Sequence, residues 1–298
     1  MSAPLRDVAE APPARLPGWA RKSGPLARGT RDVRVLLRSG SLHTVCEEAR
    51  CPNLGECFNR GTATFLLLGD RCTRRCAYCS VSTARPLPPD AGEPERVAGA
   101  ARQLGLRYVV LTSVDRDDLP DGGAAHFAAT VHAVRSALRE ARVEVLTPDF
   151  RGDEDALRAV LAAKPDVFNH NIETVPRLFP RLRPQGRYRL SLDLLAAAKA
   201  IRPGQTTKSG LMVGLGETDE EVVAVLADLR AVGVDVVTIG QYLRPTRAHE
   251  PVHRYVTPAA FRDLDARARA LGFPTVYSGV FVRSSFNAEE VYRSGGLR

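Results

Sequence analysis

The sequence predicts an α/β fold, a partial (β/α)6 barrel of the TIM type. Short apolar runs of β-type residues recur six times after residue 62, as expected for parallel strands buried on both faces. Amphipathic helical stretches separate these runs. An unbroken β/α alternation implies a parallel sheet with right-handed crossovers. Six units are fewer than the eight that close a full barrel, so one side should stay open to a large substrate.

The same patterns place the individual elements. The expected strands are 63–68, 108–112, 143–146, 166–172, 207–213 and 235–239. The expected helices are 95–104, 124–138, 154–163, 190–201, 219–232 and 259–271. Thr218, with Glu221 three residues later, forms a capping box before the helix at 219–232. Thr257 followed by Pro258 provides an N-cap and a first-turn proline for the last helix.

The chain is expected to divide into four segments. Residues 1–30 are rich in Pro, Ala, Gly and Arg without periodicity and are predicted to form a flexible N-terminal arm. Residues 31–61 form an extension with a short helical pattern and three cysteines. The barrel is expected over 62–280, and a C-terminal segment over 281–298.

Composition narrows the class of protein. With 44% hydrophobic and 26% charged residues, the chain is typical of a soluble globular protein. No run of 18 apolar residues predicts a membrane span. The N-terminus carries Asp7 and Glu10 and lacks the apolar stretch of a secretion signal, so a cytoplasmic protein is expected. The net charge of +8 comes almost entirely from scattered arginines, and no nucleic-acid-binding module is present, so no nucleic-acid partner is expected.

All six cysteines lie between residues 46 and 79, in two triplets. The first has the spacing C-x4-C-x5-C and the second C-x3-C-x2-C: Cys46, Cys51 and Cys57, then Cys72, Cys76 and Cys79. Three thiolates hold an iron–sulfur cluster while leaving one iron free of cysteine. The spacing therefore favours two clusters, each with one special iron.

Other uses of the cysteines fit less well. Structural zinc normally takes four ligands, often in paired C-x2-C units, and neither triplet offers that. Six cysteines could form three disulfides, but disulfides belong to oxidising compartments and small secreted domains. Ferredoxin-type carriers use other spacings, with a fourth cysteine, and would be smaller than this chain.

The second triplet follows the first predicted strand directly, at the end of the barrel where active sites lie. With Tyr78 before its last cysteine, it resembles the signature of radical S-adenosylmethionine (SAM) enzymes. The resemblance implies that Cys72, Cys76 and Cys79 hold a 4Fe–4S cluster. Its free iron would bind the amino and carboxylate groups of SAM, and reduction would cleave SAM to a 5′-deoxyadenosyl radical.

The upstream string HTVCEEARCPNLGEC resembles the auxiliary-cluster motif of lipoyl synthases. Further strings match that family between about residues 30 and 290: GTATFLLLGDRCTRRCAYC, TSVDRDDLPDGGA, FNHNIETVPRL, KSGLMVGLGET, QYLRPTRAHEPVHRYVTP and VRSSFNAEE. The resemblance implies sulfur insertion at C6 and C8 of a protein-bound N6-octanoyl-lysine. Cofactors would be SAM and two 4Fe–4S clusters, with the auxiliary cluster as sulfur donor.

The same resemblance implies a serine ligand for the auxiliary cluster. The family motif R-S-S-Y appears here as Arg283-Ser284-Ser285-Phe286, so Ser285 would join Cys46, Cys51 and Cys57. Phe286 replaces the usual tyrosine, which leaves open what a phenol hydroxyl would have bonded.

Several polar residues are candidates for contact with SAM or substrate because they follow or lie on predicted strands. They are Tyr78, Ser113, Asp115, Asn171, Glu173 and Lys208. Position at the carboxyl face of the barrel favours that role. Each could equally be a helix cap or a surface residue.

The family resemblance also implies partners. The substrate would be an octanoylated carrier protein, such as the acyltransferase subunit of a 2-oxoacid dehydrogenase or the glycine-cleavage H protein, and the electron source a ferredoxin or flavodoxin. Two alternatives remain. Another two-cluster radical SAM enzyme of the methylthiotransferase type would need an RNA-binding domain, for which few residues follow the last helix. An iron–sulfur electron carrier would not cleave SAM.

Overall fold

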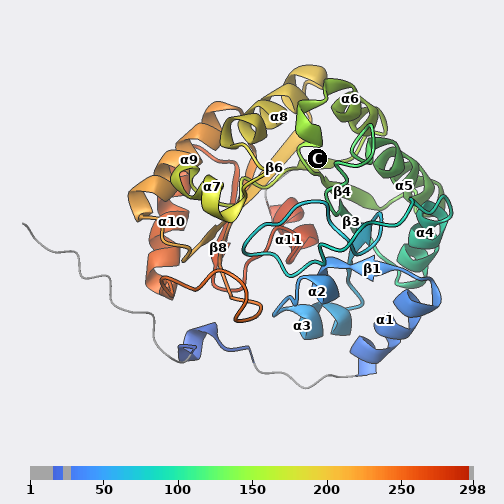
Figure 1. Ribbon diagram of the computed structural model, residues 1–298, viewed down its shortest axis with the longest axis horizontal. Helices are drawn as coiled ribbons and strands as arrows, with labels where there is room; N and C mark the ends of the chain where they lie inside the picture. Colours follow the sequence, from blue (N-terminus) through green and yellow to red (C-terminus); the bar gives the residue numbers. More distant parts are fainter. Residues whose placement is uncertain (1–15, 23–27, 295–298) are drawn as a thin grey trace, which may run out of the picture.

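The computed structural model describes residues 16–22 and 28–294 (Figure 1). Most of the predicted N-terminal arm, residues 1–15 and 23–27, and residues 295–298 of the C-terminal segment lie outside the described residues. Eight strands form one open sheet in chain order, with β1 antiparallel to β2 and the others parallel. The strands are β1 (His43–Thr44), β2 (Thr64–Leu67), β3 (Tyr108–Ser113), β4 (Arg142–Leu146), β5 (Val167–Asn169), β6 (Thr206–Val213), β7 (Val236–Gln241) and β8 (Thr275–Gly279).

The predicted partial barrel is confirmed, and its six expected strands are β2 to β7. The sequence did not predict the two edge strands. β1 is only two residues long, and the outer half of β8 is only partly buried, so neither shows a continuous apolar run. β5 is shorter than expected: it ends at Asn169, and beyond it only Glu173, with a left-handed φ of 70°, forms a bridge to Leu211 of β6.

Helices cover the outer face of the sheet, and its two edge strands, β1 and β8, do not pair with each other (Figure 1). They are α1 (Arg28–Ser39), α2 (Val45–Glu48), α3 (Leu54–Asn59), α4 (Glu93–Gln103), α5 (Ala124–Ala137), α6 (Glu154–Ala162), α7 (Phe179–Leu182), α8 (Tyr188–Ile201), α9 (Asp219–Ala231), α10 (Pro258–Ala270) and α11 (Ala288–Ser294). Short 3-10 turns are η1 (Gly18–Ala20), η2 (Phe150–Gly152) and η3 (Pro176–Leu178). The capping box of α9 and the Thr257 cap of α10 form as predicted.

The open side of the barrel is filled by segments from both ends of the chain (Figure 1). The C-terminal helix α11 contacts both β3 and β8, and so spans the gap between two distant strands. Tyr292 of α11 stacks on Tyr108, the first residue of β3, with ring centroids 5.6 Å apart. These rings form a small core with Val110, Val167 and Ala288, separate from the main core between sheet and helices. This small core holds α11 beside the amino end of the barrel.

Two glycines let the segment before α11 lie against the inner face of the sheet. A Cβ at Gly240 of β7 would come within 2.2 Å of the Val282 carbonyl oxygen. A Cβ at Gly210 of β6 would come within 2.7 Å of the Ser284 hydroxyl. Real Cβ atoms do not approach this closely, so these positions need glycine. They fix where the serine pair enters the barrel.

No helix in the described ranges is long and apolar enough to cross a membrane.

Candidate active site

The second cysteine triplet lies in the loop after β2, at the carboxyl edge of the sheet. Cys72 is anchored by a backbone bond from its N–H to the Ser82 carbonyl, 2.8 Å. The Cys79 N–H donates to the Cys76 carbonyl at 3.0 Å, which closes a tight turn. The Arg74 N–H donates to the Cys72 sulfur at 3.4 Å. The loop is therefore a preformed turn with its sulfurs held by backbone contacts.

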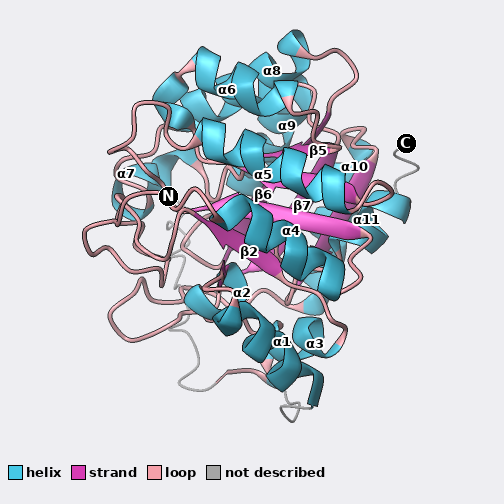
Figure 2. Cartoon of the chain, turned by 90° about the vertical axis from the view of Figure 1, so that its right-hand side faces the viewer, coloured by secondary structure: helices cyan, strands magenta, loops and turns pink. Residues whose placement is uncertain are grey.

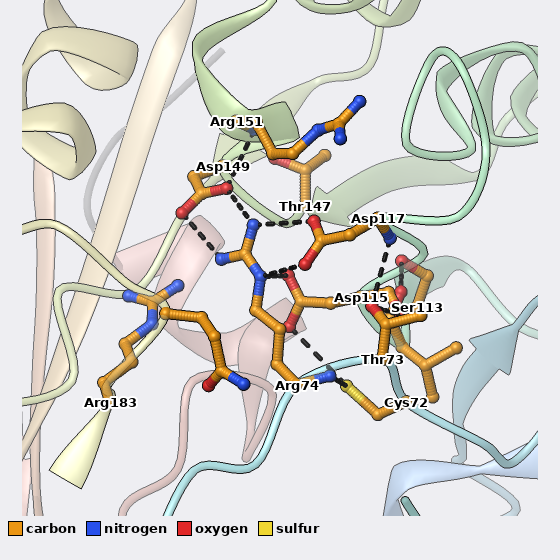
Figure 3. Close-up of polar contacts among 12 residues, drawn as sticks. Cys72, Thr73, Arg74, Ser113, Asp115, Asp117, Thr147, Asp149, Arg151 and Arg183 are labelled. Atoms are coloured by element: carbon orange, nitrogen blue, oxygen red, sulfur yellow. Dashed lines mark hydrogen bonds and ion pairs between the residues drawn. The ribbon is translucent and has the colours of Figure 1, made fainter. Parts of the chain in front are cut away.

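Arg74, inside this loop, ties it to the ends of β3 and β4 (Figure 3). Its guanidinium forms bidentate hydrogen bonds with Asp149, at 2.6 and 2.8 Å, and with Asp117, at 2.8 and 2.9 Å. Burial alone would raise the pKa of Asp149, but the bonds from Arg74 reverse the shift and lower it. Because removing one partner from a buried ion pair costs several kcal/mol, this pairing holds the cysteine loop firmly in place.

Asp115 lies where the sequence predicted it, next to the cysteine loop (Figure 3). Its carboxylate is 3.7 Å from the Cys72 sulfur and 3.4 Å from the Arg74 guanidinium. Burial raises its pKa, against the opposing charges of Arg74 and Arg183. The Ser113 hydroxyl is already engaged, because it donates a hydrogen bond to the carbonyl of the neighbouring residue Val114.

Asn171 and Glu173 follow β5 and face the same space. Burial raises the pKa of Glu173, although the positive Arg183 and a hydrogen bond from Asn171 oppose it. Arg183 is only 6% exposed and donates to the Asn171 carbonyl at 3.1 Å. A buried cation thus stands beside two half-buried carboxylates, Asp115 and Glu173, and beside Cys76. Such a set can bind a zwitterionic ligand.

The loop after β7 covers the cysteine turn. The Glu250 N–H donates to the Ala77 carbonyl at 2.9 Å, and a ring nitrogen of His249 is 3.0 Å from the Cys79 carbonyl. On the other side, the Ala77 N–H donates to the Leu182 carbonyl of α7 at 2.9 Å. The carboxyl edge is therefore closed around the triplet by two loops.

The first triplet is built on short helices α2 and α3. The Thr44 hydroxyl caps α2, and the Cys51 N–H donates to the Cys46 carbonyl at 3.0 Å. The Cys57 N–H donates to the Asn53 carbonyl at 2.9 Å. These contacts hold the backbone of all three cysteines, which line one cavity.

One cavity of about 860 Å³ joins the two triplets. Cys46, Cys51 and Cys57 line it together with Cys79 and Ser285. Apolar side chains of the inner barrel wall, Val110, Leu146 and Met212, complete the lining between them. The arrangement provides an apolar chamber with sulfur ligands at two places on its wall.

The two serines of the Arg283-Ser284-Ser285 string have different surroundings. The Ser284 hydroxyl donates to the Asn171 side-chain oxygen at 2.6 Å. Among the described residues, the Ser285 hydroxyl has no hydrogen-bond partner, and Ser285 lines the cavity with the first triplet. The iron ligand expected in this string, Ser285, is therefore the serine whose hydroxyl is not engaged by another described residue.

The chemistry of the thiols fits iron–sulfur clusters. Burial raises the pKa of Cys46, Cys72 and Cys79 to about 12 and that of Cys57 and Cys76 to about 11. Without a metal these thiols would stay protonated, and iron bound to them would displace the protons. In the described part of the chain no three Cys, His, Asp or Glu side chains converge on a single ion; the thiols of a cluster each bind a different iron and need no common point.

The described end of the predicted arm packs on the first triplet. The Lys22 ammonium donates to the Asn53 side chain at 2.6 Å and pairs with Glu56 at 2.5 Å. It also lies over the rings of Phe281 and Phe286, at 5.1 and 4.7 Å from their centroids. Lys22 therefore joins the arm, the cysteine helices and the C-terminal segment. The aromatic face of Phe286 makes this contact without a phenol hydroxyl.

We expect Lys22→Met to loosen the auxiliary site, because it removes one ion pair and two cation–π contacts. In a background with alanine at Cys72, Cys76 and Cys79, iron release to a chelator should become about fivefold faster. Lys199→Met is the matched control, since Lys199 pairs with Asp235 in the barrel. Equal release from the Lys22 variant and its parent would contradict the role given to Lys22.

Lys208 is buried on β6 and is not among the residues that line the cavity, and its contact with SAM or substrate stays a prediction. Its ammonium is 2.9 and 3.0 Å from the two carboxylate oxygens of Glu144, and both residues are buried. Tyr108 and Asn169 also donate to Glu144. Lys208 pairs in register with Asn169, the last residue of β5, and burial of its charge there requires a carboxylate partner. Tyr78, by contrast, lines the cavity beside Cys79 as expected.

Sequence reasoning missed Arg74, Arg183 and Arg283. Burial lowers the pKa of Arg283, which lines the cavity near Cys51 and Glu173. Arginine is the commonest charged residue type in this chain and is scattered throughout, so its abundance hid these three. The one available signal was their place: Arg74 lies within the second triplet and Arg283 directly before the serine pair.

Comparison with known proteins agrees with this geometry. Residues 66–229 match the model of the radical SAM superfamily. Methylornithine synthase (PylB) shares the fold with a TM-score of 0.56 at 17% identity, over 85% of this chain and 76% of that one. HydG, a maturase of the FeFe hydrogenase, gives a TM-score of 0.58 at 13% identity, over 85% of this chain and 68% of that one. The fold and site define a radical SAM enzyme.

Sequence relatives are more specific. A lipoyl synthase of Rubrobacter xylanophilus is 56% identical over 274 residues, 92% of this chain and 85% of that protein. One from Chloroflexus aurantiacus is 56% identical over 292 residues, 96% of this chain and 95% of its own length. One from Methylococcus capsulatus is 57% identical over 279 residues, 93% of this chain and 87% of its own length. The chain belongs to the lipoyl synthase family, whose radical SAM sulfur insertion uses SAM and two 4Fe–4S clusters.

Proposed function

We propose that the two triplets divide the work of lipoyl synthesis. Cys72, Cys76 and Cys79 hold the 4Fe–4S cluster that binds SAM. Cys46, Cys51 and Cys57, with Ser285, hold the auxiliary 4Fe–4S cluster that donates sulfur. The product is a lipoyl group, made by sulfur insertion at C6 and C8 of a protein-bound N6-octanoyl-lysine. The observation that carries this proposal is one cavity lined by the first triplet, by Cys79 of the second triplet and by Ser285.

When bound, the clusters and SAM supply the radical that removes hydrogen from an unactivated carbon and the sulfide that replaces it. The chain's own residues position the reactants and exclude water. Val110, Leu146 and Met212 offer an apolar wall to an alkyl chain. The loop bearing Glu250 and His249 closes the carboxyl edge over the SAM-binding triplet.

The buried polar residues beside that triplet suit the charged end of SAM. Arg183 offers a cation to a carboxylate, and Asp115 or Glu173 accepts from an ammonium group. The Asn171 carbonyl accepts a hydrogen bond from Arg183, and the Asn171 side chain accepts one from Ser284. We assign Tyr78, Asp115, Asn171 and Glu173 to the SAM and substrate site on this basis.

The segments follow the same division. The extension at 31–61 and the C-terminal segment at 281–298 jointly build the auxiliary site, and the barrel at 62–280 builds the SAM site. The natural substrates are octanoylated carrier domains, such as the acyltransferase subunit of a 2-oxoacid dehydrogenase or the glycine-cleavage H protein. The reductant is a ferredoxin or flavodoxin, and the reaction belongs in the cytoplasm because six free thiols need reducing conditions.

The metal content tests this assignment directly. Reconstituted protein should contain about eight iron and eight sulfide ions per chain, as two 4Fe–4S clusters require. Alanine at Cys72, Cys76 and Cys79 together should leave about half. Anaerobic incubation with SAM, dithionite and an octanoyl-lysine peptide should yield the lipoyl product by mass spectrometry. Tightly bound zinc with little iron, or no sulfur in the product, would refute the proposal.

A further inference from the structure

The cavity between the clusters has an exposed rim made largely of arginines. Six of its lining residues are exposed, and four of them are Arg50, Arg60, Arg107 and Arg293. The other two are Thr62 and Glu290. The side chains of Arg60, Arg107 and Arg293 are 59%, 72% and 62% exposed. We call these four arginines the arginine rim.

The arginine rim lies at the opposite edge of the sheet from the SAM-binding triplet. Arg107 directly precedes β3, whereas Cys79 follows β2, and the two strands are parallel. Arg293 belongs to α11, whose Tyr292 stacks on the first residue of β3. Figure 2 shows α11 at the far end of the sheet from α7, which follows β5. The cavity therefore runs from the amino edge of the sheet toward the cysteine loop.

The carboxyl edge is the less accessible entrance. The cavity lining there, including Tyr78, Cys79 and Tyr242, is buried or half-buried. Hydrogen bonds from the loop after β7 to Ala77 and Cys79 hold that edge closed. Among the residues that the structure describes, the exposed part of the lining lies at the arginine rim, so an acyl chain tethered to a folded domain can reach the cavity there.

Charge at the rim indicates the kind of partner. Arg107 is 3.2 Å and Arg293 2.9 Å from the Glu289 carboxylate. Arg60 donates to the Asn287 side chain at 3.1 Å and pairs with Glu56 at 2.9 Å. Glu289 and Glu290 are the acidic residues of the cavity lining near this edge, so with Glu56 included four arginines still leave the rim net positive. A positive rim around an apolar chamber fits an acidic protein surface that presents a long acyl chain.

We propose that the octanoylated carrier docks on the arginine rim through an acidic surface and threads its acyl-lysine from the amino edge of the barrel. This inference rests on the proposed function for the identity of the acyl group. The distal carbons of the chain would then lie between Cys79 and Ser285, while the lysine stays at the rim. The SAM side and the carrier side of the enzyme are separate faces.

The test compares Arg107→Gln/Arg293→Gln with Arg158→Gln/Arg189→Gln. The control arginines are exposed and pair with carboxylates at i,i+4 on α6 and α8, as Arg293 pairs with Glu289 on α11. Both variants lose the same charge. Fluorescence anisotropy measures binding of an acidic octanoylated lipoyl domain to each reconstituted enzyme, and iron content and helicity verify that both variants are intact.

We expect Kd for the carrier to rise about tenfold in the rim variant at low salt and hardly at all in the control, with the difference shrinking as salt is added. The ratio of kcat/KM for the carrier to that for a short octanoyl-lysine peptide should fall by a similar factor. Unchanged carrier binding in the rim variant, or equal loss in both variants, would overturn the docking surface. Rim-dependent binding without sulfur insertion would instead leave the docking surface standing and refute the proposed function.

Discussion

SAM cleavage should disappear when Cys76 is replaced by alanine and persist when Cys51 is replaced. Cys76 is one of three thiols in the loop after β2, beside Arg183 and Asp115. With only two thiols left, the loop cannot hold the SAM-binding cluster stably, so 5′-deoxyadenosine formation should fall by at least about a hundredfold. Chromatography of the nucleoside product after reduction with dithionite measures this directly.

Cys51→Ala is the matched variant because it removes one thiol from the other triplet. It should keep at least part of the SAM cleavage, uncoupled from product, while sulfur insertion into an octanoyl-lysine peptide is lost. Iron content in each variant should fall by about half. Normal SAM cleavage in both variants would contradict the assignment of the loop after β2 as the SAM site.

The sequence predicted most of the barrel because its signals are local. Each of β2 to β7 is a continuous apolar run, and α9 and α10 carry their own caps. β1 and β8 were missed because their pairing depends on neighbours distant in sequence rather than on their own residues. The short helices α2 and α3 were missed for a related reason: the cysteine spacing conceals their helical period.

The candidate residues that belong to motifs of fixed spacing could be named from the sequence, whereas those whose position depends on an ion pair could not. The six cysteines and Ser285 could be named from motifs alone. The surroundings of Lys208 could not be predicted, because a lysine on a strand can point toward the mouth of the barrel or toward a buried carboxylate. Its carboxylate partner, Glu144, lies 64 residues away in sequence. Arg74 likewise pairs with Asp149, 75 residues away in sequence. Ion pairs between residues distant in sequence are therefore the part that needs the structure.

Replacing Ser285 with alanine should disable sulfur insertion while sparing part of the SAM cleavage. The Ser285 hydroxyl faces the cavity with Cys46, Cys51 and Cys57, and within the described residues it makes no hydrogen bond. Alanine removes one iron ligand, so the auxiliary cluster should be lost more readily. We expect lipoyl product to fall by at least about tenfold, measured by mass spectrometry on an octanoyl-lysine peptide.

Ser284→Ala is the control that the structure supplies. It removes the 2.6 Å bond to the Asn171 side chain but no iron ligand. A part-buried hydrogen bond contributes about 1 kcal/mol, so product formation should fall by less than about fivefold. The two variants share the same backbone segment, held against Gly210 and Gly240, so general disruption of that segment would affect both equally.

Ser285→Cys distinguishes two possible needs of the auxiliary cluster: a fourth ligand of any kind, or a fourth ligand that releases its iron easily. A thiolate is a softer and more persistent iron ligand than an alkoxide, so this variant should keep its auxiliary iron against a chelator at least as long as the parent. Product should nevertheless fall, because an iron held by four thiolates is released less easily when the cluster gives up its sulfur. If Ser285→Ala matched Ser284→Ala, or if Ser285→Ala kept full activity, the fourth ligand would have to be another residue of the cavity.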